Sequence, residues 1–237
     1  MMKIQKFVCN MFQENCYVVS DDCQQCVIID CGALYPEESQ AIISYIKDAN
    51  LTPVHLLSTH GHFDHNCGNH NIYQHFGIAP EISSQDEKLI NNLVLQAQSL
   101  ANIQYDVPAT PVSHFFKDGE VIEFGTHKLE VVATPGHTRG SVCFLCRDEK
   151  VMFSGDTLFR HSIGRTDLQG GSMLQIIQSL RMMAQMPDDI KVLPGHGEST
   201  SIGEELAHNP YMDREDDTII KFKQRKRTST PEMYLRY

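Results

Sequence analysis

The stretch that decides the fold is "LLSTHGHFDHNCG", residues 56–68. Directly after an apolar run it places His60, His62, Asp64 and His65 within six positions. Crowding several imidazoles and a carboxylate together without a cation costs free energy through desolvation or forces large pKa shifts. We therefore interpret the cluster as part of a metal site, since imidazole and carboxylate ligands suit zinc, iron and manganese.

Three further apolar runs end on a histidine or an aspartate. These runs are "VVATPGH", "MFSGD" and "KVLPGH", and they end at His137, Asp156 and His196. In a layered α/β protein, functional sites are built at the carboxyl ends of strands and in the loops that follow them. We expect the three ends and the histidine cluster to meet in one pocket.

Seven candidate ligands are too many for one zinc ion. They suit two divalent ions that share an acidic bridge and a solvent-derived hydroxide, at the separation of roughly 3.5 to 4 Å found in two-metal hydrolases. The seven candidates are His60, His62, Asp64, His65, His137, Asp156 and His196. Among the other histidines, only His161, close behind "GDTLF", is a candidate for lining the pocket.

Composition and charge exclude several classes of partner. The chain has 237 residues and a formal net charge of -10, which repels phosphate backbones, so we expect no nucleic-acid partner. No run approaches the roughly 18 apolar residues of a transmembrane helix, and the first residues contain no continuous apolar segment of a signal peptide. We expect a soluble, cytoplasmic protein without a membrane partner.

The eight cysteines predict reduced thiols rather than a disulfide framework, because no export signal is present. Cys23/Cys26 and Cys143/Cys146 have the spacing of zinc half-sites. However, residues three apart on a strand point to opposite faces, and "SVCFLC" is typical of a strand. The first pair brackets "QQ" between two apolar runs, which favours a hairpin turn.

Strands and helices alternate along the chain without a linker, which predicts the α/β class. Helices are expected over 36–50, 84–101 and 171–186, and strands over the apolar runs that surround them. A chain of this length is commonly one domain. We predict one hydrolase domain over residues 1–212, followed by a basic C-terminal tail over 213–237.

The motif "THGHFDH" is similar to the T-H-x-H-x-D-H signature of the metallo-β-lactamase superfamily, and the ordered "PGH", "SGD" and "LPGH" resemble its later ligand motifs. The similarity extends from "NMFQENCYVV" to "SIGEELAHNPY", most of the chain. It implies a four-layer αββα sandwich with the site at one edge of the two sheets. "GDTLFRHSIGRTDLQGG" and "PGHGESTSIGEELAHNP" resemble the hydroxyacylglutathione hydrolases of glyoxalase II type, especially their short bacterial branch.

The resemblance also implies a role for each ligand. His60, His62 and His137 would hold the first metal, Asp64, His65 and His196 the second, and Asp156 would bridge the two. Zinc is the expected ion, with iron and manganese as alternatives. The implied enzyme is a metal-dependent hydrolase whose metal-bound hydroxide attacks a small-molecule thioester of the hydroxyacylglutathione type. The departing thiolate has a conjugate acid with a pKa near about 8.5, so no strong general acid is needed.

Three further residues have candidate roles. Asp64 is the candidate catalytic residue, since it could orient the nucleophile as well as bind a metal. Arg165 in "GRTD" is the candidate substrate-binding residue for an anionic group, and a structural contact with Asp167 is the alternative. Asp30 resembles the family's aspartate that precedes a glycine, and we expect it to organise a loop. The proline often found between the two is replaced by Cys31.

The C-terminal end departs from the longer glyoxalase II enzymes, in which a helical domain follows the last metal histidine and supplies basic residues to glutathione. Only a short segment follows His196 here. Its basic cluster could contact carboxylates, although charged residues near a terminus are usually solvated. The cluster consists of Lys221, Lys223, Arg225, Lys226 and Arg227. The acyl group and the thiol carrier stay open.

Several rival functions share the fold. A persulfide dioxygenase has a similar "GRTD" segment but uses a mononuclear iron held by two histidines and an aspartate, and "GDTLF" and "LPGHGE" resemble the hydrolase versions instead. A lactonase has similar ligands. A flavodiiron protein would place an acidic residue at His62, and a superfamily ribonuclease would need a basic face. A non-catalytic binding module has little need for seven ligands.

Overall fold

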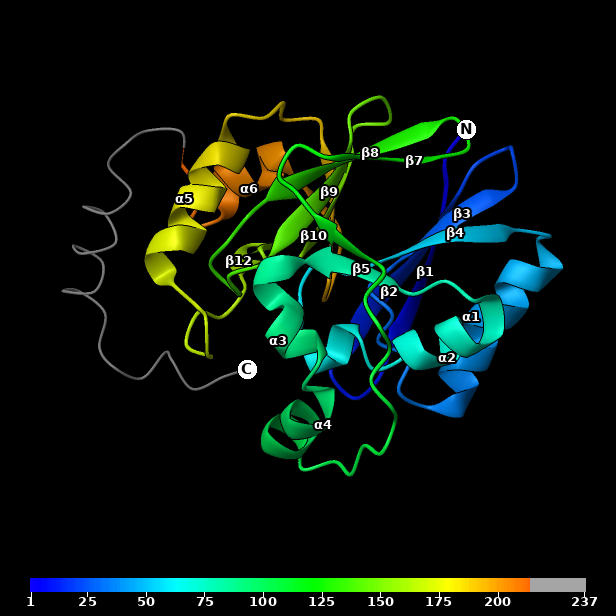
Figure 1. Cartoon of the computed structure of the whole chain (residues 1–237). Coiled ribbons are helices and arrows are strands. Elements are labelled where there is room, and N and C mark those ends of the chain that lie inside the picture. Colours follow the sequence, from blue (N-terminus) through cyan, green and yellow to red (C-terminus); the bar gives the residue numbers. More distant parts are fainter. Residues whose placement is uncertain (214–237) are drawn as a thin grey trace.

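The fold is a four-layer αββα sandwich. A computed structural model of the chain describes residues 1–213, and in it two six-stranded sheets pack face to face (Figure 1). Helices α1 (Pro36–Asp48) and α2 (Asn69–Phe76) cover the outer face of one sheet, and α5 (Met173–Ala184) and α6 (Ile202–His208) cover the other. The predicted architecture is therefore confirmed. Of the tail predicted for 213–237, all but Asp213 lies outside the described residues.

The first sheet has the strand order β1-β2-β3-β4-β5-β6. Its first three strands are antiparallel and the last three continue in parallel from β3, with α1 and α2 as crossovers. The strands are β1 Lys3–Cys9, β2 Glu14–Ser20, β3 Gln25–Ile29, β4 Thr52–Leu57, β5 Pro80–Ser83 and β6 His114–Phe116.

The second sheet has the order β14-β13-β10-β9-β8-β7 and is antiparallel apart from the parallel pair of β10 and β13. Its strands are β7 Val121–Phe124, β8 His127–Ala133, β9 Val142–Cys146, β10 Val151–Gly155, β13 Lys191–Pro194 and β14 Thr200–Ser201. A small hairpin of β11 (Leu158–Phe159) and β12 (Ser162–Ile163) follows β10 directly.

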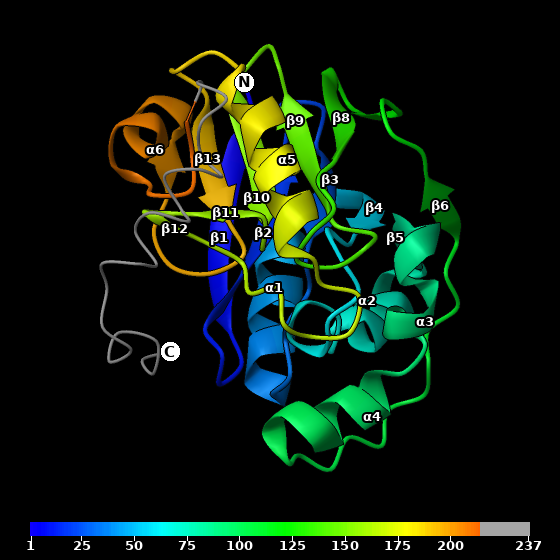
Figure 2. The same ribbon diagram turned by 90° about the vertical axis from the view of Figure 1, so that its left-hand side faces the viewer.

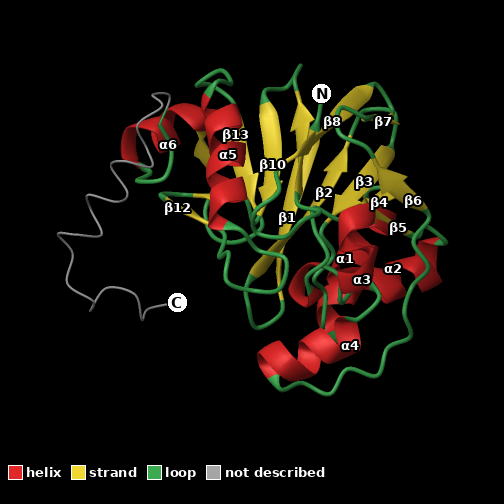
Figure 3. Ribbon diagram, turned by 60° about the vertical axis from the view of Figure 1, so that its left-hand side comes forward, coloured by secondary structure: helices red, strands yellow, loops and turns green. Residues whose placement is uncertain are grey.

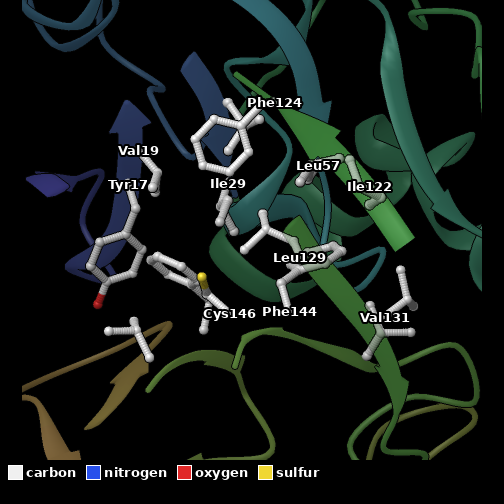
Figure 4. Close-up of a cluster of buried hydrophobic side chains, with 14 of the residues drawn as sticks. Tyr17, Val19, Ile29, Leu57, Ile122, Phe124, Leu129, Val131, Phe144 and Cys146 are labelled. Atoms are coloured by element: carbon white, nitrogen blue, oxygen red, sulfur yellow. The ribbon is translucent and has the colours of Figure 1, made fainter. Parts of the chain in front are cut away.

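Three apolar clusters hold the layers together. The cluster between the two sheets contains alternate residues of facing strands, among them Tyr17, Leu57, Leu129 and Phe144 (Figure 4). A second cluster lies between the β8–β10–β13 side and α5, and a third between β2–β4 and α1. Burying each large apolar side chain contributes about 1.5 to 3 kcal/mol, so the layers are held mainly by these clusters.

The predicted helix over 84–101 is wrong as one continuous element. The segment consists of a 3-10 turn over Ser84–Asp86, short helices α3 (Glu87–Ile90) and α4 (Leu93–Gln96), and a π turn over Ala97–Ala101. The break falls at Asn91 and Asn92, where the Asn92 side chain donates to the Lys88 carbonyl at 2.6 Å. Asparagine competes with helical hydrogen bonding in this way.

The cysteine pairs do not form zinc half-sites. On β9, Cys143 packs in the cluster under α5 and Cys146 packs between the sheets, so the two thiols point to opposite faces. Cys23 is exposed and Cys26 is buried at the predicted hairpin between β2 and β3. All eight cysteines have free thiols in the structure.

The strands that carry the candidate ligands end at one edge of the sandwich. The loops after β4, β8, β10 and β13 gather below the strands, with α5 on one side and α3 and α4 on the other (Figures 2 and 3). None of the helices in residues 1–213 has the length and apolar character needed to cross a membrane.

His55 on β4 forms a charged contact within its own sheet and a hydrogen bond to the other sheet. Its Nδ1 lies 2.6 Å from Glu81 Oε1 on the neighbouring β5, and its Nε2 lies 3.3 Å from the Glu123 carbonyl on β7. The Glu81 carboxylate raises the pKa of His55 above its ordinary value. The pair therefore stabilises the fold fully below the unfolded-state pKa of His55, and this contribution is lost as the pH rises through the folded-state pKa.

We predict that His55→Gln lowers the free energy of unfolding by about 1 kcal/mol at pH 6 and by less at pH 9. Thermal or denaturant unfolding of the metal-replete protein at the two pH values measures the difference. The matched control is His75→Gln, which changes an exposed imidazole on α2. An effect of His55→Gln that is the same at both pH values would contradict the role of the charged pair.

Candidate metal centre

The loop after β4 brings its histidines into the interior. A 3-10 turn over Phe63–His65 folds the loop back on itself, and His60, His62 and His65 are 1%, 6% and 0% exposed. His60 Nε2 is buried and has no hydrogen-bond partner in residues 1–213. A buried imidazole nitrogen left in this way is costly unless something else binds it.

The loops after β8, β10 and β13 bring the remaining candidates to the same place. His137 Nε2 lies 2.9 Å from His62 Nδ1, and His196 Nε2 lies 3.1 Å from His65 Nε2. His196 Nε2 also lies 3.3 Å from Asp64 Oδ2. The structure thus brings all seven predicted residues together.

The seven residues form two groups with one carboxylate between them. The ligand atoms of His60, His62 and His137 lie within 4.8 Å of one another, and those of Asp64, His65 and His196 do the same. Asp156 faces both groups: its Oδ2 is 3.4 Å from His137 Nε2, and its Oδ1 is 3.3 Å from His65 Nε2.

The donor set fits divalent cations. Two pairs of imidazole nitrogens face each other at hydrogen-bonding distance, and each such pair needs a proton or a cation between its lone pairs. Asp156 Oδ1, like His60 Nε2, is buried without a hydrogen-bond partner among the described residues. Nitrogen and oxygen ligands in three-residue groups are the usual composition of catalytic zinc and iron sites.

The two groups differ in their electrostatics. Burial lowers the pKa of His60 well below its ordinary value and that of His62 to about 3, so both imidazoles are neutral and carry free lone pairs. Burial also opposes protonation of His65, but the carboxylates of Asp156 and Asp64 raise its pKa well above the ordinary value. The group of Asp64, His65 and His196 therefore attracts positive charge, which a proton or a metal cation can supply.

Asp156 itself is strongly acidic. Burial alone would raise the pKa of its carboxyl, but the adjacent His65 and His196 hold that pKa well below the usual range. The ionised carboxylate can thus accept bonds from both sides at neutral pH. This property suits a residue that lies between two cations.

The outward nitrogens of three histidines are fixed by oxygen atoms. His65 Nδ1 lies 3.0 Å from Asp30 Oδ2, His137 Nδ1 2.7 Å from the Arg165 carbonyl, and His196 Nδ1 3.0 Å from the Phe12 carbonyl. Such contacts set the tautomer, so that the inward nitrogen is free to bind. Asp30 also accepts hydrogen bonds from the Thr59 backbone and hydroxyl, both at 2.7 Å. This is the loop-organising role expected for it.

Sequence reasoning missed the buried amides that hold the loops. Asn66 Nδ2 donates to the carbonyls of His60 and His62, at 2.9 and 2.7 Å. Asn15 Nδ2 donates to the carbonyls of Pro194 and Gly197 on either side of His196. Asn66 directly follows the histidine cluster, and this position in the sequence could have identified it as a residue that holds the loop.

Asp86 was also missed, because we assigned it to the start of a helix. Its carboxylate instead accepts hydrogen bonds from the Gly61 N–H at 3.0 Å, the Thr138 hydroxyl at 2.6 Å and the Gly140 N–H at 2.8 Å. It therefore ties the loop of His60 and His62 to the loop of His137. Its partners lie far away in sequence, so no local pattern could identify it.

Close approach of the loops requires glycine at Gly195. A Cβ atom there would lie 2.5 Å from Asp156 Oδ1 and 2.6 Å from His65 Cε1. At Gly155, directly before Asp156, φ is +48° and a Cβ atom would meet the Thr59 side chain at 2.3 Å. Both glycines let the ligand loops pack without a side chain between them.

The site opens into a cleft of about 680 Å³. Phe12, Leu100, Phe159 and Leu168 give it apolar walls, and Arg160 and Arg165 also line it. The Arg165 guanidinium forms two hydrogen bonds of 2.8 Å to Asp167, the structural contact considered as the alternative to substrate binding. His161 is not among the lining residues, and its Nε2 contacts Glu204 at 3.0 Å instead.

Comparison with known proteins finds a matching family and several similar proteins. A family model for the metallo-beta-lactamase superfamily matches residues 9–196. The hydroxyacylglutathione hydrolase GloC of Haemophilus influenzae is 36% identical over 215 residues, which cover 89% of this chain and 98% of that protein.

Two solved structures are also similar. The B3 metallo-beta-lactamase BLEG-1 has a TM-score of 0.81 and 33% identity, over 90% of this chain and 99% of that one. TTHA1623 in a di-iron-bound form has a TM-score of 0.78 and 30% identity, over 88% of this chain and 100% of that one. Relatives of similar identity thus carry different named activities.

We predict that Asp86→Asn lowers the affinity of the site for divalent metal about 10- to 100-fold, the usual effect of changing a residue that supports the ligands. The amide would direct its NH2 group at one of three hydrogen-bond donors and loosen one of the two loops. Competition with a chromophoric chelator measures the affinity.

Asp48→Asn, at the exposed end of α1, is the matched control for loss of one carboxylate. Circular dichroism at the same protein concentration tests that the fold is kept. Metal affinity equal to that of the unmodified protein would show that Asp86 does not support the ligand loops.

Proposed function

The chain belongs to the metallo-β-lactamase superfamily, and from that premise we propose that it is a metal-dependent thioester hydrolase of the hydroxyacylglutathione type. The observation that carries the proposal is the convergence of three histidines, a second histidine–aspartate group and Asp156 at the floor of one cleft. The similarity to GloC supports the thioester as substrate.

We assign the seven residues to two metal positions. His60, His62 and His137 would hold the first ion, and Asp64, His65 and His196 would hold the second. Asp156, which faces both groups, would be shared between them. Zinc is the proposed ion, and the di-iron form of TTHA1623 supports iron as the alternative. Two ions in such a site lower the pKa of water toward about 7 and polarise the carbonyl of the substrate.

The chain's own residues prepare the reaction. Asp64 has a side chain that is 20% exposed toward the cleft, and its pKa is lowered because the charges of His65 and His196 outweigh burial. Its ionised carboxylate can accept a hydrogen bond from the attacking water and so orient the oxygen toward the thioester carbon. The apolar side chains of Phe12 and Phe159 restrict bulk water around the scissile bond.

Departure of the thiol requires little help. The sulfur leaves as a thiolate whose conjugate acid has a pKa of about 8.5, so no side chain has to donate a proton to it. The cleft accordingly contains metal ligands and apolar walls. Arg165 lines the cleft, but its guanidinium is paired with Asp167 and would have to leave that exposed partner to bind an anionic group of the substrate.

We predict that metal-replete protein releases thiol from S-lactoylglutathione and takes up no oxygen with glutathione persulfide. Thiol release is followed with a chromogenic disulfide, and oxygen uptake with an electrode. Oxygen uptake with persulfide would replace the proposal with a mononuclear-iron dioxygenase. Inactivity toward S-lactoylglutathione combined with opening of a lactone would replace it with a lactonase.

A second prediction concerns the ligands. His60→Ala and Asp156→Ala should each lower kcat/KM for the thioester by about 100-fold or more, because one ligand of the first group or the shared carboxylate is removed. Metal content per chain, measured by elemental analysis, should fall in parallel. His75→Ala on α2 is the control, and far-ultraviolet circular dichroism should be unchanged. Unaltered turnover in both ligand variants would contradict the assignment of the site.

A further inference from the structure

A second cleft lies beside the one that contains the metal centre. It has a volume of about 670 Å³ and lies between the α3–α4 segment and the loops at Arg139 and Gly170. Neighbouring residues of the same segments line the two clefts: Leu100 and Leu168 line the first, and Ser99 and Gln169 line the second. The two clefts are therefore adjacent along both of their walls.

The second cleft contains two cations without a carboxylate partner. Arg139 and Lys88 are exposed at its wall, and neither side chain forms an ion pair with any residue in 1–213. The cleft is also lined by Asp86, whose carboxylate already accepts hydrogen bonds from three donors. Free cations in a concave surface attract anions, so the cleft favours a negatively charged ligand.

The first cleft lacks such free cations. The Arg160 guanidinium is paired with Glu198, and that of Arg165 is paired with Asp167. A substrate that carries an oxyanion at a distance from its thioester would therefore find an unpaired guanidinium only in the neighbouring cleft, within the described part of the chain. Arg139 is near enough, since it follows the ligand His137 by two residues, which span at most about 7 Å of backbone.

The other residues of the second cleft suit a ligand with amide groups. Gln85 and Gln169 line it, and each side chain has an amide donor and an acceptor. Leu89 and Leu95 add apolar surface. The aliphatic stem of Arg139 lies beside Gly170, where a Cβ atom would be 3.6 Å from Arg139 Cγ. The guanidinium is thus supported near the cleft by packing of its stem.

We propose that this second cleft binds the oxyanion at the far end of the thiol half of the substrate, with Arg139 and Lys88 as its ligands. The oxyanion is a carboxylate or a phosphate, both of which a guanidinium can bind through two parallel hydrogen bonds. The proposal rests on the proposed thioester hydrolysis and adds the group by which the enzyme selects its thiol carrier.

Three thioesters test the proposal: S-lactoylglutathione with carboxylates, acetyl-coenzyme A with phosphates, and the neutral S-acetyl-N-acetylcysteamine. Arg139→Gln and Lys88→Gln should each lower kcat/KM about tenfold for the anionic substrate, mainly through KM. Hydrolysis of the neutral thioester should change by less than about twofold. If the two variants hydrolyse S-lactoylglutathione more slowly, the oxyanion is a carboxylate. If they hydrolyse acetyl-coenzyme A more slowly, it is a phosphate.

The controls are Arg147→Gln, at an arginine paired with Glu130 on β8, and Lys47→Gln, at an exposed lysine on α1. Neither should alter any of the three rates. Equal losses for charged and neutral thioesters in Arg139→Gln would overturn the proposal, because the arginine would then act only on the loop of His137.

A binding measurement separates this proposal from the reaction itself. Failure of the unmodified, metal-replete protein to hydrolyse all three thioesters would refute the proposed function alone. Calorimetry with S-methylglutathione and with desulfo-coenzyme A then tests the cleft without turnover. Binding of either ligand that weakens about tenfold in Arg139→Gln supports the subsite, and binding that is equal in both proteins overturns it.

Discussion

The carboxylate of Asp156 lies where four loops meet, within 3.7 Å of His65, His137 and His196, and the arrangement of the candidate ligands depends on these contacts. The loops come from both sheets, and burying their polar ends without a common charged centre would cost desolvation free energy. The neutral His60 and His62 belong to the first group, and the more basic His65 belongs to the second. The two sides therefore differ in charge, because the first group consists of three histidines and the second contains the carboxylate of Asp64.

Buried polar side chains that are not themselves candidate ligands also hold the ligand loops. Asn66 and Asp86 bind backbone groups of the loop after β4, and Asn15 binds those around His196. Each of these side chains has at least two partners, so the desolvation cost of burying it is offset. A site preorganised in this way can keep its geometry while the charge at its centre changes during a reaction.

The sequence was informative where one chemical signal was concentrated in a short segment. "THGHFDH" and the strand ends at His137, Asp156 and His196 resemble the motifs of the superfamily, and this resemblance implied the αββα fold; both the fold and the family are confirmed. The segment over 84–101 was not predictable, because Asn92 competes for helical hydrogen bonds while the apolar periodicity continues through it. Asp86 was unpredictable for another reason: its partners at Gly61, Thr138 and Gly140 are brought to it only by the tertiary fold.

The candidate catalytic residues and the residues proposed to select the substrate lie in two different, adjacent clefts. The floor of the first cleft is built from strand ends that the two sheets hold rigidly, whereas one wall of the second cleft is the broken segment around α3 and α4. Exposed positions of that segment, such as Lys88 and Leu95, can change the charge or shape offered to a substrate, whereas Gln96 is bonded to Gly61 and Phe63 of the ligand loop. Asp86 limits this freedom, because its backbone begins the segment while its carboxylate holds both ligand loops. A chain built in this way can retain one hydrolytic centre while the group that it recognises on the thiol changes.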